Sequence, residues 1–212
     1  MVRLLLRLTL PLLISFSGLM MLIRAQSHDN PELRSFLLPE DCAKPCLMGI
    51  QPGVTSTSEA IQRLRTNARI AHVGISESLE TVAWFWQPDQ SPLMDTGQIS
   101  GLFYDRDRVS LIRLYTRIPL GELLLQLDAL PGNSRVVFRR SPPFDRYHVS
   151  LYYAGDGYVV NAVVDCDDFW GSPAHLIIGA RPQFINGLGQ AADGLNEAKH
   201  LIATNCRNQQ YS

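Results

Sequence analysis

Two stretches of the chain share a pattern that restricts its possible folds more than any other feature. The residues LFYDRDRVSLI (102–112) align with LYYAGDGYVVN (151–161), and the upstream pattern EAIQRL (59–64) aligns with ELLLQL (122–127). A chance match of short apolar strands is the alternative, but both the order and the spacing of the segments agree. We therefore expect a duplicated unit of one helix followed by three strands.

The segments around these copies support the same interpretation. Alternating side chains predict a strand at TVAWFWQ (81–87) and a hairpin over 97–116 that turns at 106–107. A second helix is predicted at 119–130, and a later hairpin is indicated by the Gly-Asp-Gly turn at 155–157. The chain is therefore expected to alternate between helices and antiparallel strands.

These patterns predict an α+β fold of two tandem helix-plus-antiparallel-sheet repeats, which follow an N-terminal hydrophobic signal or anchor helix. The first αβββ repeat is expected at 45–117, with extra residues at about 65–80 between its helix and its first strand. The second αβββ repeat is expected at 118–185. Residues 186–212 are expected to form a C-terminal helix and tail.

The first helix begins at a recognisable start signal. Pro52 and Gly53 favour a turn, and Ser56 with Glu59 matches a capping box, in which the serine caps the helix and the glutamate reaches back. Three apolar residues between 60 and 64 then share one helical face. A phosphate site at this helix start is not expected, because the loop lacks the lysine and the second glycine of a P-loop.

The N-terminal residues 1–25, MVRLLLRLTLPLLISFSGLMMLIRA, have the pattern of an export signal or a membrane anchor. Arg3 and Arg7 are basic, residues 8–23 carry no charge, and the IRA triplet offers a site for cleavage. We expect the arginines to stay in the cytoplasm and the remainder to be exported, either secreted or tethered through this segment. Residues 26–44 are expected to be a linker.

Export gives the four cysteines a structural role. An even number of cysteines in an oxidising compartment predicts two disulfides, for which three connectivities are possible. Pairing Cys42 with Cys46 would close a tight loop that contains Pro45, and pairing Cys166 with Cys206 would clamp the C-terminus. For the C-x-x-x-C pair Cys42 and Cys46, a redox or metal site is the alternative, but the spacing is not that of a thioredoxin-type site and no nearby histidine completes a zinc set.

Charge and composition exclude some classes of partner. The 212 residues include 19 basic and 20 acidic side chains, so the net charge is −1, and 46% of the residues are hydrophobic. This is a globular composition without the basic face that nucleic acids require. No nucleic-acid partner and no cofactor is therefore expected.

The stretch GIQPGVTSTSEAIQRL (49–64) resembles the helix start of small bacterial envelope domains of the BamE type. Two such units in tandem resemble the layout of the β-lactamase-inhibitor protein. The motif PC-x-x-GI-x-PG-x-T is similar to one in uncharacterised exported bacterial proteins. The likeness is specific over 45–64 and only topological over 80–164. This chain lacks the lipidated cysteine of BamE and carries two copies, so BamE's assembly role does not transfer. These families imply a scaffold or binder rather than an enzyme.

An enzymatic or metal-binding alternative centres on the loop DCDDFWGSPAH. The loop carries Asp165, Asp167, Asp168 and His175. Three aspartates would suit a hard cation such as calcium, but the loop lacks the alternation and the central glycine of an EF-hand. Cys166 would have His148 or His175 as a base if it were a nucleophile, whereas a disulfide is the expected state of this cysteine. An exported hydrolase or metal-binding protein is thus the alternative, and we expect no catalytic activity.

The predicted strands are rich in aromatic residues, which offers a surface for a protein partner. Neighbouring side chains of a strand point to opposite faces, and helices cover only one face of a sheet. We therefore expect Trp84, Trp86, Phe103 and Tyr152 to contribute to a protein-binding surface. The alternative is that these residues form a second layer of core. The expected function is a non-catalytic module that binds an envelope or extracellular protein.

Overall fold

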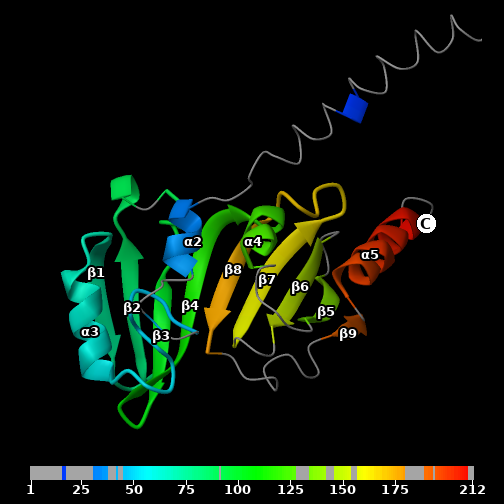
Figure 1. Cartoon of the computed structure of the whole chain (residues 1–212). Helices are drawn as coiled ribbons and strands as arrows, with labels where there is room; N and C mark the ends of the chain where they lie inside the picture. Colours follow the sequence, from blue (N-terminus) through cyan, green and yellow to red (C-terminus); the bar gives the residue numbers. More distant parts are fainter. Residues whose placement is uncertain are drawn as a thin grey trace, which may run out of the picture. The chain divides into compact units, whose positions relative to one another are not determined.

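Pairing between neighbouring strands organises the chain into one antiparallel sheet (Figure 1). The computed structural model describes residues 16–17, 31–37, 42, 45–90, 92–127, 134–141, 146–153, 157–179, 189–192 and 194–209. The elements are α2 (Pro31–Leu37), α3 (Thr57–Thr66), β1 (Ile70–Ser76), β2 (Thr81–Trp86), η1 (Pro88–Gln90), β3 (Ser100–Asp105), β4 (Arg108–Pro119), α4 (Leu120–Leu127), β5 (Ser134–Ser141), β6 (Arg146–Tyr153), β7 (Tyr158–Asp165), β8 (Pro173–Ile178), β9 (Gln190–Ala192) and α5 (Leu195–Gln209).

The order of the strands in the sheet divides them into two meanders. Among the described residues the sheet has nine strands in the order β1-β2-β3-β4-β8-β7-β6-β5-β9. Helix α3 precedes the meander β1–β4, and α4 precedes the meander β5–β8. The last strands of the two meanders, β4 and β8, pair with each other and join the halves. The expected α+β class with antiparallel strands is confirmed.

Helices α3 and α4 each precede four strands that form one meander, whereas the sequence predicted three. The additional strand of the first meander is β1, which lies within the residues at about 65–80 that were expected to be an insertion. Val73 and Ile75 alternate with His72 and Gly74, but a register shift between Ile70 and His72 breaks the alternation and leaves only a short run. The additional strand of the second meander is β8.

The sequence alignment of the two copies does not follow the order of the strands. It matches the β3–β4 hairpin to the β6–β7 hairpin, although β3 and β4 are third and fourth in their meander while β6 and β7 are second and third. Antiparallel hairpins share an alternating pattern and a polar turn, so local similarity cannot tell which hairpin corresponds to which. The residue-by-residue match of the two copies therefore does not follow the order of the strands, and the duplication stays a prediction.

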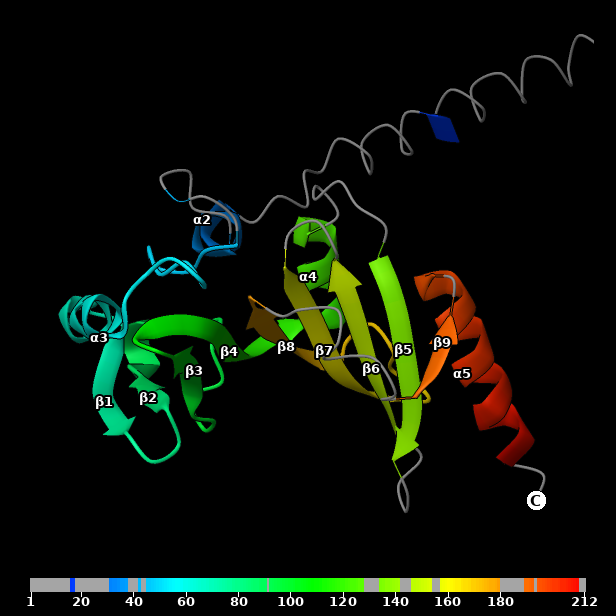
Figure 2. The ribbon, with the colours of Figure 1, turned by 90° about the horizontal axis from the view of Figure 1, so that it is seen from below.

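The main core lies on the face of the sheet that the helices cover. Figure 2 shows α2, α3 and α4 on the same side of the strands, and residues of α5 join the same buried cluster. Because alternate residues of a strand share a face, each strand contributes every second side chain to this core. On β2, for example, Val82, Trp84 and Trp86 are buried against it.

The start of α3 confirms the predicted cap. The Glu59 N–H donates to the Ser56 Oγ at 3.3 Å, so the serine is the N-cap. The Glu59 carboxylate turns instead to Arg63, at 2.7 Å, rather than reaching back as in a complete capping box. The preceding turn is fixed to β4, since the Gly53 N–H donates to the Val109 carbonyl.

Helix α2 corrects part of the expected linker at 26–44. Pro31 suits the first turn of a helix, where its missing N–H costs nothing. Leu33 and Leu37 lie four residues apart and are fully buried in the core. The Tyr158 hydroxyl of β7 donates to the Leu37 carbonyl at 3.4 Å, so α2 is attached to the second meander. A seven-residue helix is too short to show a period in the sequence.

Both disulfides have the predicted pairing. Cys42 is bonded to Cys46, with Cα atoms 6.0 Å apart, and Cys166 is bonded to Cys206, with Cα atoms 5.9 Å apart. These bonds suggest an oxidising, extracytoplasmic location.

The chain divides into residues 1–30 and 31–212, and the second part is one compact unit. The expected signal or anchor at 1–25 lies outside the described residues, apart from 16–17. Among the helices that the structure describes, none has the length and apolar character needed to cross a membrane.

Candidate functional site

The structure separates the four aromatic residues that were predicted to bind a protein. Trp84 and Trp86 are 0% and 2% exposed, and they lie in the core that the helices cover. Their burial corrects the expectation, because neither indole has surface for a partner to contact. They instead fit the alternative of a core layer, and Trp86 packs edge-on against Trp84 and Phe36.

The other two aromatic residues lie on the opposite face of the sheet. Tyr152 is 5% exposed and belongs to a small second cluster with Val137 and Val159, so it too is corrected from surface to buried. Phe103 is partly exposed, and the Arg113 guanidinium lies over its ring at 5.3 Å. Of the four predicted residues, Phe103 retains the accessible aromatic surface that a binding site requires.

The loop DCDDFWGSPAH, which was considered as an enzymatic or metal-binding site, makes structural contacts in this protein. Asp165 forms an ion pair with Arg146 at 2.7 Å, and the Asp168 carboxylate accepts a hydrogen bond from the Gly171 N–H at 2.8 Å. Cys166 is committed to its disulfide. His175 lies on β8 with its ring 4.8 Å from that of Tyr115. The loop therefore does not bring its acidic and imidazole groups together.

The same loop also caps the start of α4, the helix that follows β4. The N–H groups of Leu120 and Gly121, at the start of α4, donate to the carbonyls of Ser172 and Trp170 at 2.8 and 3.0 Å. The first N–H groups of a helix have no partner within it, so these carbonyls replace a capping side chain. Within the described part of the chain, no group of three histidine, cysteine or acidic side chains is placed to hold a metal ion.

The face opposite the helices carries a row of aligned residues across five strands, and the members on four of these strands are polar. Cross-strand pairing aligns Val137 of β5 with Ser150 of β6, Asn161 of β7, His175 of β8 and Tyr115 of β4. Residues that are paired directly across an antiparallel sheet point to the same face. None of the described helices covers this face, so we call it the uncovered face.

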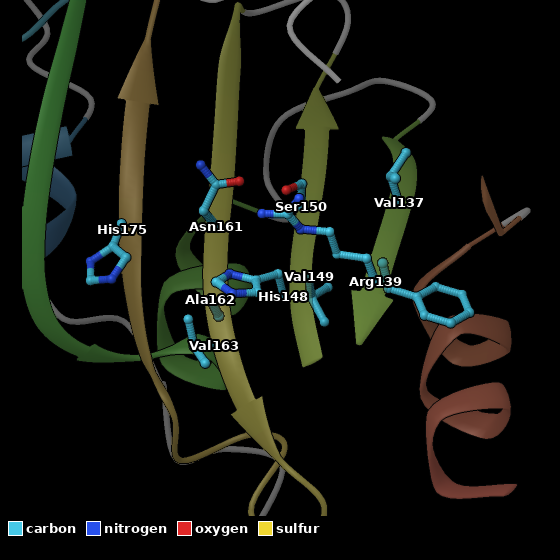
Figure 3. Close-up of a pocket in the computed structure, with 10 residues that line it drawn as sticks. Val137, Arg139, His148, Val149, Ser150, Asn161, Ala162, Val163 and His175 are labelled. Carbon is cyan, nitrogen blue, oxygen red and sulfur yellow. The ribbon is translucent and has the colours of Figure 1, made fainter. Parts of the chain in front are cut away.

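A depression of about 330 Å³ lies on the uncovered face over β5 to β8 (Figure 3). Figure 3 shows the Arg139 side chain extending across β6 toward Ser150, and the His148 ring lying over β7. Asn161 rises from β7, and His175 borders the depression from β8. The depression is lined by Val137, Phe138, Arg139, His148, Val149, Ser150, Asn161, Ala162, Val163 and His175.

Both histidines of the depression favour the neutral form. Burial lowers the pKa of His148 below its ordinary value of 6.5, and the positive charge of Arg139 lowers it further. Burial also lowers the pKa of His175, an effect that Asp95 opposes and Arg113 reinforces. Both rings are thus mainly uncharged at neutral pH and can donate or accept one hydrogen bond at each nitrogen.

Several polar groups of the depression have no partner within the described protein. The His175 Nδ1 atom is buried and makes no hydrogen bond there. No described carboxylate forms an ion pair with Arg139, in contrast to Arg146 on the next strand. The depression therefore presents one guanidinium and neutral donors, and it contains no acidic side chain.

Sequence reasoning found the two histidines but not the site. Both were considered as bases for Cys166, and the alternation of His148 with Tyr147 and Val149 already places it away from the core. Arg139, Ser150 and Asn161 occupy the same kind of outward position. What joins them is the register between β5, β6 and β7, and register depends on pairings that one sequence does not reveal.

Comparisons with known proteins give one structural likeness. No family model matches the chain, and no curated protein matches its sequence. The chain is similar in structure to a DUF4309 family protein (YjgB) from Bacillus subtilis subsp. subtilis str. 168, with a TM-score of 0.38 and 16% identity. The match covers 64% of this chain and 84% of that one. A superposition this loose carries no argument about function, and the resemblance to BamE-type domains stays a prediction.

Proposed function

We propose that this protein is a non-catalytic, exported module of two tandem helix-plus-sheet repeats that binds another envelope or extracellular protein. Residues 1–25 would direct its export or tether it to the membrane. The observation that carries the proposal is the uncovered face of the sheet, which no described helix covers. The two disulfides support an extracytoplasmic setting.

The uncovered face over the first meander has the form of a contact surface. Gly74, Ala83 and Gly101 are direct cross-strand neighbours, so they form a strip in which little side chain covers the backbone. Phe85 follows Ala83 by two residues, and Phe103 follows Gly101 by two residues on the antiparallel strand. The two phenylalanines therefore flank the strip on opposite sides.

Aromatic side chains beside a flat strip suit protein recognition. Phe85 is 41% exposed, and Phe103 is partly exposed beside Arg113. Aromatic and arginine residues are enriched among the positions that dominate binding energy, because they bury large areas with few rotatable bonds. We therefore assign Phe85 and Phe103 as anchors of the proposed surface, in place of Trp84 and Trp86.

Replacing Phe85 tests the proposal without disturbing the core. We expect Phe85→Ala to weaken capture of the partner from solubilised envelopes by about tenfold or more, as loss of an aromatic anchor does. Leu125→Ala is the matched control, because Leu125 is 58% exposed on α4, on the side of the helices. Equal capture by both variants and the unchanged protein would contradict the proposal.

A further inference from the structure

The depression over β5 to β8 holds more polar groups than the protein itself satisfies. The lining contributes one guanidinium from Arg139, imidazoles from His148 and His175, a hydroxyl from Ser150 and an amide from Asn161. One of these groups, Nδ1 of His175, is buried without a hydrogen-bond partner among the described residues. Buried polar atoms are normally paired, so this atom adds an unsatisfied polar group beside the depression.

We propose that this depression binds the carboxylate of an acidic side chain that the protein partner presents. The inference rests on the proposed function, because it names the chemistry by which the uncovered face recognises that partner. A glutamate would place its carboxylate between Arg139 and Asn161, and its aliphatic stem would lie against Val163.

The charges of the site favour an anion. Arg139 is the one side chain of the lining that carries a full charge at neutral pH, and no described carboxylate forms an ion pair with it. Guanidinium groups bind carboxylates through two parallel hydrogen bonds, which are stronger than bonds between neutral groups. Arg146, on the same face, is already neutralised by Asp165, whereas Arg139 forms no ion pair with a described carboxylate.

The size and walls of the site favour a carboxylate on a short apolar stem over a phosphate. At about 330 Å³ the depression is at the small end of the range for ligand sites, so it suits a side chain rather than a large ligand. Its polar groups lie beside the aliphatic side chains of Val137 and Val163, which point to the same face. A phosphate dianion would need more than one cation and would gain nothing from these walls.

The protonation of His148 provides a reporter of occupancy. In the free protein, burial and Arg139 hold its pKa below 6.5. The charged groups around it are Arg139 on β5 and the Arg146–Asp165 pair on β6 and β7, and Asp95 and Arg113 act on His175 beyond β7. A bound carboxylate favours the imidazolium form, so the pKa of His148 rises on binding and binding strengthens as the pH falls toward 6.

The experiment is a titration of the full exported chain, followed by NMR of its histidine rings. The probe is N-acetyl-glutamate amide, and N-acetyl-glutamine amide is its neutral isostere. We expect the glutamate probe to shift the His148 signals and raise the pKa of that ring, while the glutamine probe does neither. We expect Arg139→Gln to weaken binding by about tenfold or more, because a charge-assisted pair is lost.

Arg140→Gln is the matched control, since it removes the same charge from the same strand but on the opposite face. Equal loss in both variants would overturn the proposal, as would equal binding of the two probes or no response of His148. Tighter binding of inorganic phosphate, or of free butyrate, than of the glutamate probe would overturn it as well.

If the glutamate probe does not bind while Phe85→Ala weakens capture of the partner, the inference fails and the proposed function stands. If the probe binds but Phe85→Ala and Leu125→Ala capture equally, the proposed function fails.

Discussion

At the scale of single residues, the two buried tryptophans of β2 show how a polar atom is accommodated in this core. The Trp86 Nε1–H donates to the Ser100 hydroxyl at 2.9 Å, and both residues are buried. The Trp84 Nε1 atom is also buried but has no hydrogen-bond partner among the described residues. A buried N–H without a partner costs free energy because it gave up its bond to water, so Ser100 is a stabilising residue.

Removing the Ser100 hydroxyl should therefore destabilise the fold. We expect Ser100→Ala to lower the free energy of unfolding by about 1–2 kcal/mol, because the Trp86 N–H is then buried without a partner. Urea unfolding followed by tryptophan fluorescence measures the change. Ser110→Ala is the control, since its exposed hydroxyl donates to the Phe103 carbonyl and should matter little. A Ser100→Ala variant as stable as the control would show that the hydrogen bond contributes nothing.

At the scale of elements, the segment after β7 joins three parts of the fold. Its carbonyls cap α4, and its Cys166 is bonded to Cys206 of α5. Helix α5 also buries Ala198 and Ile202 in the main core. The segment that sequence analysis considered for catalysis is therefore a junction between helices.

Opening the junction should cost more stability than opening the short disulfide. Replacing Cys166 and Cys206 with serine releases a loop with a sequence separation of 40, and the chain-entropy model gives a loss of about 4 kcal/mol. The Cys42–Cys46 bond spans a separation of 4, for which the same model gives about 2 kcal/mol. Thermal unfolding of the two double variants compares them directly. A larger loss for the short loop would contradict the role given to the junction.

The elements also show what the sequence could and could not predict. Features signalled by neighbouring residues were predicted correctly. The Ser56 cap of α3 is present, and so is the turn at Arg106 and Asp107, where φ is 48° and 66°. The disulfide pairing followed from an even cysteine count and from spacing. Elements without a local signal were missed: α2 is too short for a period, and β9 has three residues.

The candidate site was less predictable than the fold, for a physical reason. Alternation along β2 separates Trp84 from Phe85, but it does not say which of the two faces the helices will cover. The wrong face was therefore assigned to the tryptophans. The depression depends on Arg139, His148 and Asn161 coming together from three strands, which requires the register of two pairings.

At the scale of the whole molecule, the pairing of β4 with β8 makes one sheet from two meanders. The join matters for function because it extends one face across both halves. The Phe85 and Phe103 strip lies on the first meander, and the depression lies over β5 to β8. If the sheet works as one surface, a partner contacts both regions at once.

Site-specific photo-crosslinking in cells that make the protein tests this claim most directly. A benzophenone amino acid is placed in turn at Phe103 and Ser150, on the uncovered face of each meander, and at Leu125 and Glu59, on the exposed sides of α4 and α3. We expect Phe103 and Ser150 to form an adduct with the same partner, and Leu125 and Glu59 to form none with it. Adducts with that partner from Leu125 or Glu59, and none from Phe103 and Ser150, would place the contact surface on the helices and rule out the uncovered face as the binding surface.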